Sequence, residues 1–343
     1  ETTGQATSAG GGTGLTTAQL MDSSNYIGWD FTNTWWMIEG ETRPFLQSEY
    51  STEITNSHQL QMMAMDLDAD YTLASNIDMA ELTNPSGMWN TERGFVPVGN
   101  DSTNFTGTFD GQGYVISDLY INRPESDYIG LFGYTSLASI MNVGIENSNV
   151  TGKNNVGGLV GYNSNSPITN SYATGSVTGT NGYIGGLLGS NLDSSITDSG
   201  ATGIVSGAYT LGGLVGYNSN SLITNSYATG SVTGTGNNVG GLVGYNFDSF
   251  ITDSYTTGSV SGTDHVGGLV GRTEGSSSSI TNSYATGSVT GTNGYIGGLV
   301  GGNYYSPITN SYATGSVSGA YTLGGLVGYN HGSSITDSYA TGS

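Results

Sequence analysis

The chain has 343 residues, of which 58 are glycine, 23 are tyrosine and none is cysteine, and only 9% are charged. The lack of cysteine excludes disulfides and cysteine-based metal sites, and the aromatic and β-branched content distinguishes the chain from a disordered Gly/Ser polymer. The net charge of −21 lies mainly in residues 1–128, and the five Lys and Arg are too scattered to neutralise a nucleic-acid backbone.

The first 50 residues divide into a linker and a small module. Residues 1–14 are rich in Gly, Thr and Ser and are predicted to form a flexible linker. In residues 15–50, Thr16 and Gln19 form a capping-box pattern before Leu20, which predicts a short helix. The tryptophan cluster of this module is either an exposed docking patch or a cap of the following array, and we favour the cap. Aromatic strands are expected through Trp29, Phe31, Trp35, Trp36 and Ile38.

Residues 51–128 are predicted to contain a capping helix and two or three irregular starter coils. The helix should run from about Ser57 to Leu67, with Leu60 and Met63 on the same side as Leu67. Such a helix would cover the open edge of the first coil, which would otherwise pair with other chains. Strand-like runs follow at 71–79, 95–98, 105–109 and 114–121.

Residues 129–343 repeat the motif Gly-Leu-hydrophobic-Gly with a period of 27 to 30 residues. Each unit holds three short apolar segments bounded by Gly or Asn, which suit strands of three to five residues better than helices. We therefore predict an all-β, parallel β-solenoid of eight coils. The leucines of the motif are Leu131, Leu159, Leu187, Leu214, Leu242, Leu269, Leu299 and Leu326.

Equal positions of successive coils should stack into ladders. Two apolar ladders are expected to point inward and form the core. The first is Ile168, Ile196, Ile223, Ile251, Ile280, Ile308 and Ile335, and the second is Val177, Val205, Val232, Val260, Val289 and Val317.

A tyrosine column has two interpretations, either an aromatic binding strip or a packing ladder, and we favour the ladder. Its members are Tyr172, Tyr227, Tyr255, Tyr284, Tyr312 and Tyr339, with Gly200 as a gap.

Two polar columns are interpreted as structural. Asparagine in the first column should occupy turns, because it tolerates left-handed backbone, and its amides should bond from coil to coil. This column is Asn163, Asn191, Asn218, Asn246, Asn303 and Asn330, interrupted by Thr273. The second is Asn170, Asp198, Asn225, Asp253, Asn282, Asn310 and Asp337, in which no two neighbours are both Asp.

Three functional alternatives compete with a purely structural protein. Calcium binding is suggested by the pairs Asp193/Asp198 and Asp248/Asp253, although a hard cation needs six or more oxygens. A carbohydrate-active enzyme needs clustered carboxylates, and Asp66, Asp68 and Asp70 are clustered, but they are interpreted as a solvated helix end. Ice or glycan binding would use a flat threonine face built from Thr174, Thr202, Thr229, Thr257, Thr286 and Thr314.

The repeat array also contains a longer period and an abrupt end. Ile168–Gly189 recurs 112 residues later as Ile280–Gly301 with one difference, which indicates a duplicated four-coil block. The chain stops at Ser343 inside a repeat. An uncapped coil is an association template, so we expect either a longer parent chain or head-to-tail contact with another copy.

The Gly-Leu-Val-Gly units with Ile-Thr-Asn-Ser-Tyr-Ala-Thr-Gly-Ser-Val resemble the GLUG-motif repeats of bacterial and archaeal surface proteins of the filamentous-haemagglutinin-like or adhesin-like kind. This resemblance implies a right-handed β-helix at the cell surface and carries no catalytic residues. Residues 70–79 and 105–111 resemble the segment that usually leads such an array, whereas residues 1–46 resemble the segment that usually follows one. The order suggests that the chain is part of a longer protein.

The sequence therefore predicts an extracellular structural or adhesive protein that forms a stalk, fibre or self-assembling filament. We expect no catalytic residues, no cofactor, no metal and no membrane insertion. The expected partners are further copies of the chain and surface glycans, and nucleic acid is not among them.

Overall fold

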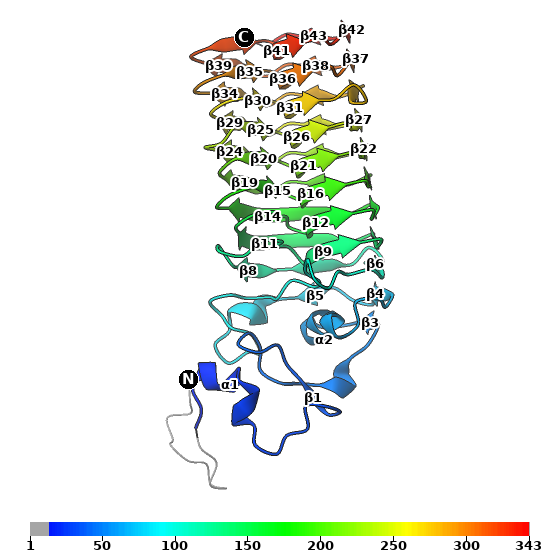
Figure 1. Cartoon of the computed structure of the whole chain (residues 1–343), viewed down its shortest axis with the longest axis vertical. Helices are drawn as coiled ribbons and strands as arrows, with labels where there is room; N and C mark the ends of the chain where they lie inside the picture. The colour runs from blue at the N-terminus through cyan, green and yellow to red at the C-terminus, as the bar shows by residue number, and fades with distance from the viewer. Residues whose placement is uncertain (1–13, 343) are drawn as a thin grey trace.

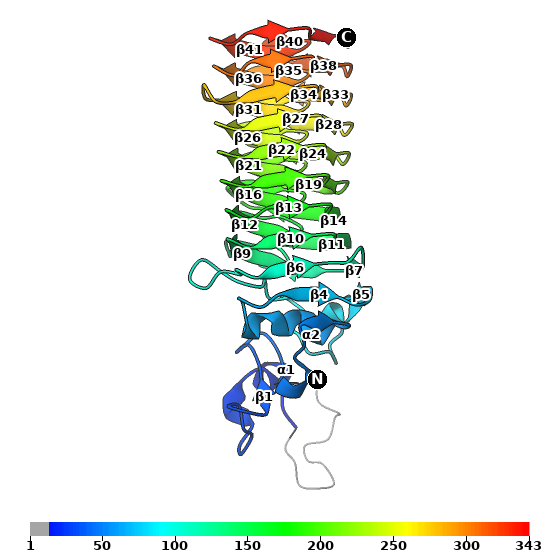
Figure 2. The same cartoon turned by 90° about the vertical axis from the view of Figure 1, so that its right-hand side faces the viewer.

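The computed structural model describes residues 14–342, so most of the predicted linker lies outside the described residues. The chain forms an elongated stack of coils, with a small N-terminal module at one end and the C-terminal coil at the other (Figures 1 and 2). Its strands form three long parallel sheets and one shorter parallel sheet along the stack, and an antiparallel pair lies in the N-terminal module. This arrangement confirms the predicted all-β parallel solenoid. Each of its eight coils contributes one strand to the 8-stranded sheet.

Each coil passes through the sheets in a fixed order. The 8-stranded sheet comprises β9 (Phe132–Ser136), β12 (Val160–Ser164), β16 (Leu188–Leu192), β21 (Val215–Ser219), β26 (Val243–Phe247), β31 (Val270–Glu274), β36 (Val300–Tyr304) and β41 (Val327–His331). The 11-stranded sheet comprises β3 (Glu53–Ile54), β4 (Tyr71–Leu73), β6 (Thr108–Asp110), β10 (Ser139–Met141), β13 (Ile168–Thr169), β17 (Ser195–Thr197), β22 (Leu222–Thr224), β27 (Phe250–Thr252), β32 (Ser279–Thr281), β37 (Ile308–Thr309) and β42 (Ile335–Thr336).

The other two sheets complete the coil. The 16-stranded sheet comprises β5 (Ile77–Asp78), β7 (Val115–Ser117), β8 (Tyr120–Asn122), β11 (Gly144–Gly152), β14 (Tyr172–Gly179), β18 (Gly200–Ala201), β19 (Ile204–Gly207), β23 (Tyr227–Ala228), β24 (Val232–Gly234), β28 (Tyr255–Thr256), β29 (Val260–Gly262), β33 (Tyr284–Ala285), β34 (Val289–Gly291), β38 (Tyr312–Ala313), β39 (Val317–Gly319) and β43 (Tyr339–Ala340). The 6-stranded sheet comprises β15 (Tyr183–Gly185), β20 (Thr210–Gly212), β25 (Asn238–Gly240), β30 (Val266–Gly267), β35 (Tyr295–Gly297) and β40 (Thr322–Gly324).

The isoleucine and valine ladders form the core, as predicted. Ile168 pairs in register with Ile196, and Val177 pairs with Val205, so the same apolar position recurs in the next coil. The isoleucines from Ile168 to Ile308 are fully buried, and those valines are at most 3% exposed up to Val289. Ile335 in the last described coil is 37% exposed, because no further coil covers it among the described residues.

The glycine pair of the repeat motif is required by close backbone packing. A side chain at Gly213 would place its Cβ 2.0 Å from the carbonyl oxygen of Gly241 in the next coil. Real Cβ atoms do not approach backbone oxygen so closely, so only glycine fits where the chain passes from the 6-stranded to the 8-stranded sheet. The motif is a structural corner of each coil.

The N-terminal module is less regular than predicted. Helix α1 (Thr17–Leu20) has the expected capping box, in which Thr16 and Gln19 bond each other's backbone. The aromatic run gives only β1 (Trp35–Trp36), which pairs with β2 (Phe45–Leu46), and the prediction of strands through Trp29 and Phe31 was wrong. Gly28 has a φ of +84°, and the carboxylate of Asp30 accepts the amides of the next turn, which bend the chain away from a strand.

Helix α2 (Ser57–Met62) lies beneath the first coils and continues as a 3-10 turn, η3 (Met63–Met65) (Figure 1). Leu60 and Met63 are fully buried, and Leu67 packs against the same core from a partly exposed position. The helix was predicted to run to about Leu67, but α2 ends at Met62 and the 3-10 turn ends at Met65. The remaining 3-10 turns are η1 (Ser23–Asn25), η2 (Gln47–Glu49) and η4 (Ala80–Thr83).

The predicted strand at 95–98 was wrong, because this segment makes only single bridges at Gly94 and Val98. Its backbone carbonyls instead accept side-chain donors, Phe95 from Arg123 Nε at 3.3 Å and Val96 from Gln61 Nε2 at 3.0 Å. Arg123 also connects the N-terminal module to the first coils. The Arg123 guanidinium donates to both carboxylate oxygens of Glu41 at 3.1 and 2.9 Å, and Arg93 bonds the same carboxylate at 2.7 Å. Arg123 is 5% exposed and Glu41 is 12% exposed, so this ionic contact is largely shielded from water.

Candidate functional site

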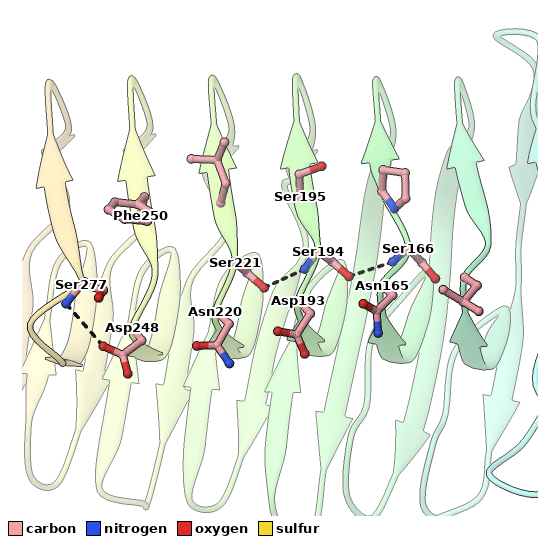
Figure 3. Close-up of a pocket in the computed structure, with 13 residues that line it drawn as sticks. Asn165, Ser166, Asp193, Ser194, Ser195, Asn220, Ser221, Asp248, Phe250 and Ser277 are labelled. Atoms are coloured by element: carbon pink, nitrogen blue, oxygen red, sulfur yellow. Dashed lines mark hydrogen bonds between the residues drawn. The ribbon is translucent and has the colours of Figure 1, made fainter.

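An open groove of about 880 Å³ runs along one corner of the solenoid, where the 8-stranded sheet turns into the 11-stranded sheet (Figure 3). We call the turns that line it the groove corner. They extend from Leu137 in one coil to Ser277 five coils later. Because coils are spaced by about 4.8 Å, the groove is roughly 24 Å long and parallel to the solenoid axis.

Serines form the floor of the groove. The backbone N–H of Ser166 donates to Ser194 Oγ at 2.9 Å, and the N–H of Ser194 donates to Ser221 Oγ at 3.1 Å (Figure 3). Each hydroxyl in turn donates to a carbonyl two residues earlier in its own coil, as Ser166 Oγ does to Ser164 at 2.7 Å. The hydroxyl thus satisfies a buried backbone donor at the bend between two sheets.

Sequence reasoning missed this serine ladder, although its signal was present. A serine stands two residues before the core isoleucine in seven of the eight coils, at Ser166, Ser194, Ser221, Ser249, Ser278, Ser306 and Ser333, and Ala138 takes this place in the first coil. A second ladder at the next corner joins Ser171, Ser199, Ser226, Ser254, Ser283, Ser311 and Ser338 by N–H to Oγ bonds of 3.1 to 3.2 Å.

One rim of the groove is polar and has left-handed backbone. Asn165, Asp193, Asn220 and Asp248 have φ values between 43° and 49°, which asparagine and aspartate tolerate better than most residues. Their backbone amides are bonded to the next coil, as Asp193 N is to the Ser219 carbonyl at 3.0 Å. Their side chains therefore point away from the backbone of the rim and are accessible to solvent.

The other rim is partly apolar. It contains Pro167, Ser195, Leu222 and Phe250. Leu222 is 40% exposed and Phe250 is 45% exposed, and Leu137 at the end of the groove is 75% exposed. The groove lining holds two carboxylates and no Lys or Arg.

The aspartate pairs considered for calcium do not share a site. Asp193 lies at the groove corner and Asp198 at the next corner, on opposite sides of strand β17, and Asp248 and Asp253 flank β27 in the same way. Asp198 instead accepts a hydrogen bond from the Asn225 amide of the next coil. Within residues 14–342, no group of three or more His, Asp or Glu is arranged to hold a metal ion.

The left-handed turns predicted for the first polar column belong to the second one. Asn163, Asn191, Asn218 and Asn246 lie inside strands, fully buried, so their assignment to left-handed turns was wrong. The amides of Asn163, Asn191 and Asn218 donate to the next coil's amide oxygen at 2.8 to 2.9 Å, which confirms the predicted ladder. Asn246 donates instead to the Thr273 hydroxyl at 3.4 Å. The left-handed turns are occupied by the second column, whose members have φ values of 48° to 51°.

In the second column the asparagine amides donate toward the preceding coil. Asn282 donates to Asp253 at 3.0 Å, and Asn310 donates to Asn282 at 2.7 Å. An ionised aspartate can accept such a bond but cannot make one. Two consecutive aspartates would therefore lose the bond and face each other, which explains why every neighbouring pair contains an asparagine.

The tyrosine column is a ladder and not a platform for ligands. Tyr255 and Tyr284 stack with ring centroids 5.1 Å apart and planes 7° apart, and Tyr284 and Tyr312 are 4.9 Å and 3° apart. Both ring faces of Tyr255, Tyr284 and Tyr312 are therefore covered by neighbouring rings, whereas Tyr339 at the end of the column is 54% exposed. At the gap, a Cβ on Gly200 would lie 2.4 Å from the ring of Tyr227, so the neighbouring ring fills this space.

One tyrosine of this column is tied to a carboxylate. Tyr172 Oη donates to Glu146 Oε1 at 2.6 Å. Burial, followed by this hydrogen bond and the charge of Glu146, raises the pKa of Tyr172 to about 12. The phenol therefore stays protonated at neutral pH and serves as a structural donor.

The threonine column lies beside these rings on the 16-stranded sheet, and Thr202, Thr257, Thr286 and Thr314 are exposed. Only Thr174 lies inside a strand, β14, whereas Thr202, Thr229, Thr257, Thr286 and Thr314 follow directly after two-residue strands. The threonines are therefore placed mostly at the turns that follow these strands.

The two remaining groups of charged residues make contacts within the fold. Asp68 accepts the hydroxyl of Thr106 at 2.8 Å and Asp70 accepts the amide of Thr108 at 2.9 Å, so these carboxylates fix loops. In the array, the Arg272 guanidinium bonds Glu274 at 2.7 Å and lies 4.7 Å from the ring centre of Tyr304. Arg272 also pairs in register with Tyr245 of the preceding coil and lies 5.4 Å from the centre of that ring.

Known proteins share the repeat, the fold and parts of the sequence. Halomucin from Haloquadratum walsbyi is 39% identical over 111 residues, which are 31% of this chain and 1% of that protein. A sequence described as a Gly-rich membrane protein from Evansella cellulosilytica is 36% identical over 63 residues, 18% of this chain and 7% of that protein. The chain thus spans only a small part of these relatives' length.

A solved structure named IgA1 Protease superposes with a TM-score of 0.51 at 19% sequence identity, over 86% of this chain and 22% of that chain. At this identity the likeness shows a shared β-solenoid fold alone. The GLUG motif matches residues 152–178, 180–206, 207–233, 235–261, 262–290, 292–318 and 319–343. These matches cover more than half of the chain, which therefore belongs to the GLUG-motif family.

Proposed function

We propose that the chain is an extracellular structural protein, a rigid rod that forms part of a stalk or surface filament and has no catalytic activity. The observation that carries the proposal is the continuous in-register stacking of eight coils, in which almost every polar column bonds its neighbours. Such a solenoid gains length by adding coils without needing a new core, because each coil contacts only its neighbours.

The similarity to Halomucin and to a membrane protein supports a place at the cell surface. In the described residues, no helix is long and apolar enough to cross a lipid bilayer. The low charge of the array and its Ser/Thr exterior suit a solvated spacer, because they offer neither a catalytic carboxylate pair nor a basic surface.

We also propose that the rod extends by coil addition. The outer edges of β41 and β43 are unpaired within the described residues, and Leu323 and Ile335 beside them are 46% and 37% exposed. A further coil in register, from the same chain or a second copy, would bury both side chains. Sedimentation velocity over a hundredfold concentration range separates the two sources, because only a second copy makes the sedimentation coefficient depend on concentration.

The structural proposal is tested on the protein in its native source. Antibodies against the repeat array should label intact, unpermeabilised cells or secreted fibres, and electron microscopy should show straight segments along the label. Labelling confined to permeabilised cells would contradict the extracellular assignment. Globular particles without a rod-shaped segment would contradict the structural one.

A further inference from the structure

The two copies of the duplicated block can be compared position by position, which shows where side chains differ on the same scaffold. Residues 280–343 repeat residues 168–231 with differences at 12 of 64 positions. The groove-corner turns 192–195 and 219–222 contribute eight of these positions, and six of the eight differ. Only six of the other 56 positions differ.

The two unchanged residues in these turns are Ser194 and Ser221, which match Ser306 and Ser333. They are the serines whose hydroxyls bond the neighbouring coil's backbone. Surface position alone does not explain the changes, because the turns 180–182 and 207–209 on another side of the solenoid are identical in both blocks. The groove corner thus combines a fixed floor with exchanged outward side chains, the pattern of a surface that contacts ligands.

The chemistry of the corner restricts the class of ligand. Asp193 and Asp248 without any neighbouring Lys or Arg disfavour anionic polymers, which like-charge repulsion would keep away. The backbone donors of the rim are already bonded to the next coil, as Asn220 N is to the Phe247 carbonyl at 3.1 Å. An extended peptide therefore cannot add as a further strand, since that mode needs free backbone groups.

What remains accessible suits hydroxyl-rich, uncharged chains. Asp193 supplies acceptors, Asn220 supplies both donor and acceptor groups, and neither side chain has a hydrogen-bond partner among the described residues. Phe250 and Leu222 offer apolar surface opposite them. A pyranose has the matching character, with C–H faces for aromatic contact and equatorial hydroxyls for hydrogen bonding.

We propose that the groove corner is a carbohydrate-binding edge, which takes an extended neutral glycan lying parallel to the solenoid axis. Asp193 and Asp248 are two coils, or about 9.6 Å, apart, so a polymer with a disaccharide repeat can meet both carboxylates in the same way. This inference deepens the proposed surface function, because it adds an adhesive site to the rod.

In the second block the same edge carries a different set of side chains. Tyr304, Tyr305 and Pro307 stand where the first block has Leu192, Asp193 and Ser195. Tyr305 is 53% exposed, and its hydroxyl lies 2.9 Å from His331 Nε2. The second block therefore presents an aromatic surface, and the two blocks should differ in the sugars they prefer.

The test exchanges the groove turns for those that the chain itself carries elsewhere. A swap variant contains L192Y, D193Y, S195P, S219H, N220G and L222S, each copied from the second block. A control variant contains D198N and I204S, which copy Asn310 and Ser316 away from the groove. Both keep the ladder serines, and thermal unfolding should show that both fold.

Binding is measured on the full chain against immobilised neutral glucans, mannans, galactans and chitin oligomers, with dextran sulfate as an anionic comparison. At least one neutral polymer should retain the native chain and the control. The swap variant should bind that polymer at least tenfold more weakly, and affinity should be unchanged between 0.1 and 1 M salt.

The inference is overturned if no neutral polymer is retained, or if the swap leaves retention unaltered. Affinity that falls steeply with salt, or retention on dextran sulfate equal to that on the neutral polymer, would show that the binding does not depend on neutral hydroxyl groups and would equally overturn it. Cell-surface labelling and rod shape are measured separately, so a failed glycan test with an intact surface rod refutes the binding edge and leaves the structural function standing.

Discussion

At the scale of single residues, asparagine has two distinct uses in this solenoid. Buried Asn218 donates its amide to Asn246 and accepts from Asn191, both at 2.9 Å, so its polar groups are satisfied without water. Asn225 at the corner instead adopts left-handed backbone with a φ of 49°. The residue type is the same, but the first use depends on side-chain bonding and the second on backbone tolerance.

Removal of a buried amide should therefore be costly. We expect Asn218→Ala to lower the free energy of unfolding by about 1–3 kcal/mol, because it leaves the Asn191 donor and the Asn246 acceptor unpaired in the core. Asn218→Thr should cost less, because Thr273 occupies this position in another coil and still accepts from Asn246. Urea unfolding of both variants checks the order, and equal losses would contradict it.

The tyrosines should titrate in two groups. The pKa of Tyr172 and that of Tyr162 are both raised to about 12 from 10.0, chiefly by burial. The stabilisation linked to these phenols is complete below pH 10 and is lost as pH rises from 10 toward 12. Absorbance at 295 nm should show a late-ionising fraction, and the unfolding temperature should fall over this interval. A single transition near pH 10 in the folded protein would be inconsistent with this.

The ladders themselves were predictable from spacing, since equal positions of a 27- to 30-residue period must stack. For the apolar ladders, burial in the core was predictable from the sequence, because apolar side chains are usually buried. For the polar ladders it was not. For Asn163 and Asn170 the sequence offers the same residue type seven positions apart. Only the direction of each side chain relative to its strand, which depends on the coil's cross-section, separates the buried ladder from the corner.

At the scale of elements, the corners carry as much of the fold's specificity as the strands. Most strands of the array have only two to five residues, and the bends between them leave backbone donors without strand partners. Ser226 illustrates the solution, because its Oγ accepts the amide of Ser199 at 3.2 Å and donates to Thr224 at 2.8 Å. The recurring serine was visible in the sequence. Its role as an acceptor became clear only from the structure, which shows the backbone amide that its hydroxyl contacts.

Loss of a ladder serine should destabilise a coil more than its small volume suggests. Ser226→Ala leaves the buried Ser199 amide unsatisfied, and we expect a loss of about 1–3 kcal/mol. Ser288→Ala, on the exposed side of the 16-stranded sheet, is the matched control and should change stability by less than about 0.5 kcal/mol. Chemical denaturation distinguishes them, and similar values for both would argue against the ladder.

At the scale of the whole molecule, the N-terminal module and the solenoid are joined by a shielded ionic contact. The Glu41 carboxylate forms ion pairs with Arg123 and Arg93. Arg43 donates hydrogen bonds to the carbonyls of Pro85 and Ser86 at 3.0 and 3.1 Å. Three of the five cations in the sequence are thus used to hold this end together. Neither the pairing nor the module's orientation was predictable, because the partners are up to 82 residues apart.

Neutralising the central carboxylate should loosen the module and leave the coils intact. In Glu41→Gln, the guanidinium of Arg123 stays buried without its counter-charge, which is strongly unfavourable. Hydrogen exchange of residues 15–50 should accelerate at least tenfold, and exchange of residues 160–310 should not change. Glu53→Gln, whose side chain is exposed, is the control. Uniform acceleration along the chain would mean that the contact supports the solenoid itself.

The two asparagine columns have one further consequence for the whole rod. The buried amides donate toward the C-terminal end, as Asn163 does to Asn191, whereas the corner amides donate toward the N-terminal end, as Asn170 does to Asn142. Their dipoles therefore oppose each other in every coil that carries asparagine in both rows, as with Asn163 and Asn170, Asn218 and Asn225, and Asn303 and Asn310. In these coils the side-chain amides of one row offset those of the other, so lengthening the solenoid by such coils adds little dipole along its axis from side-chain amides.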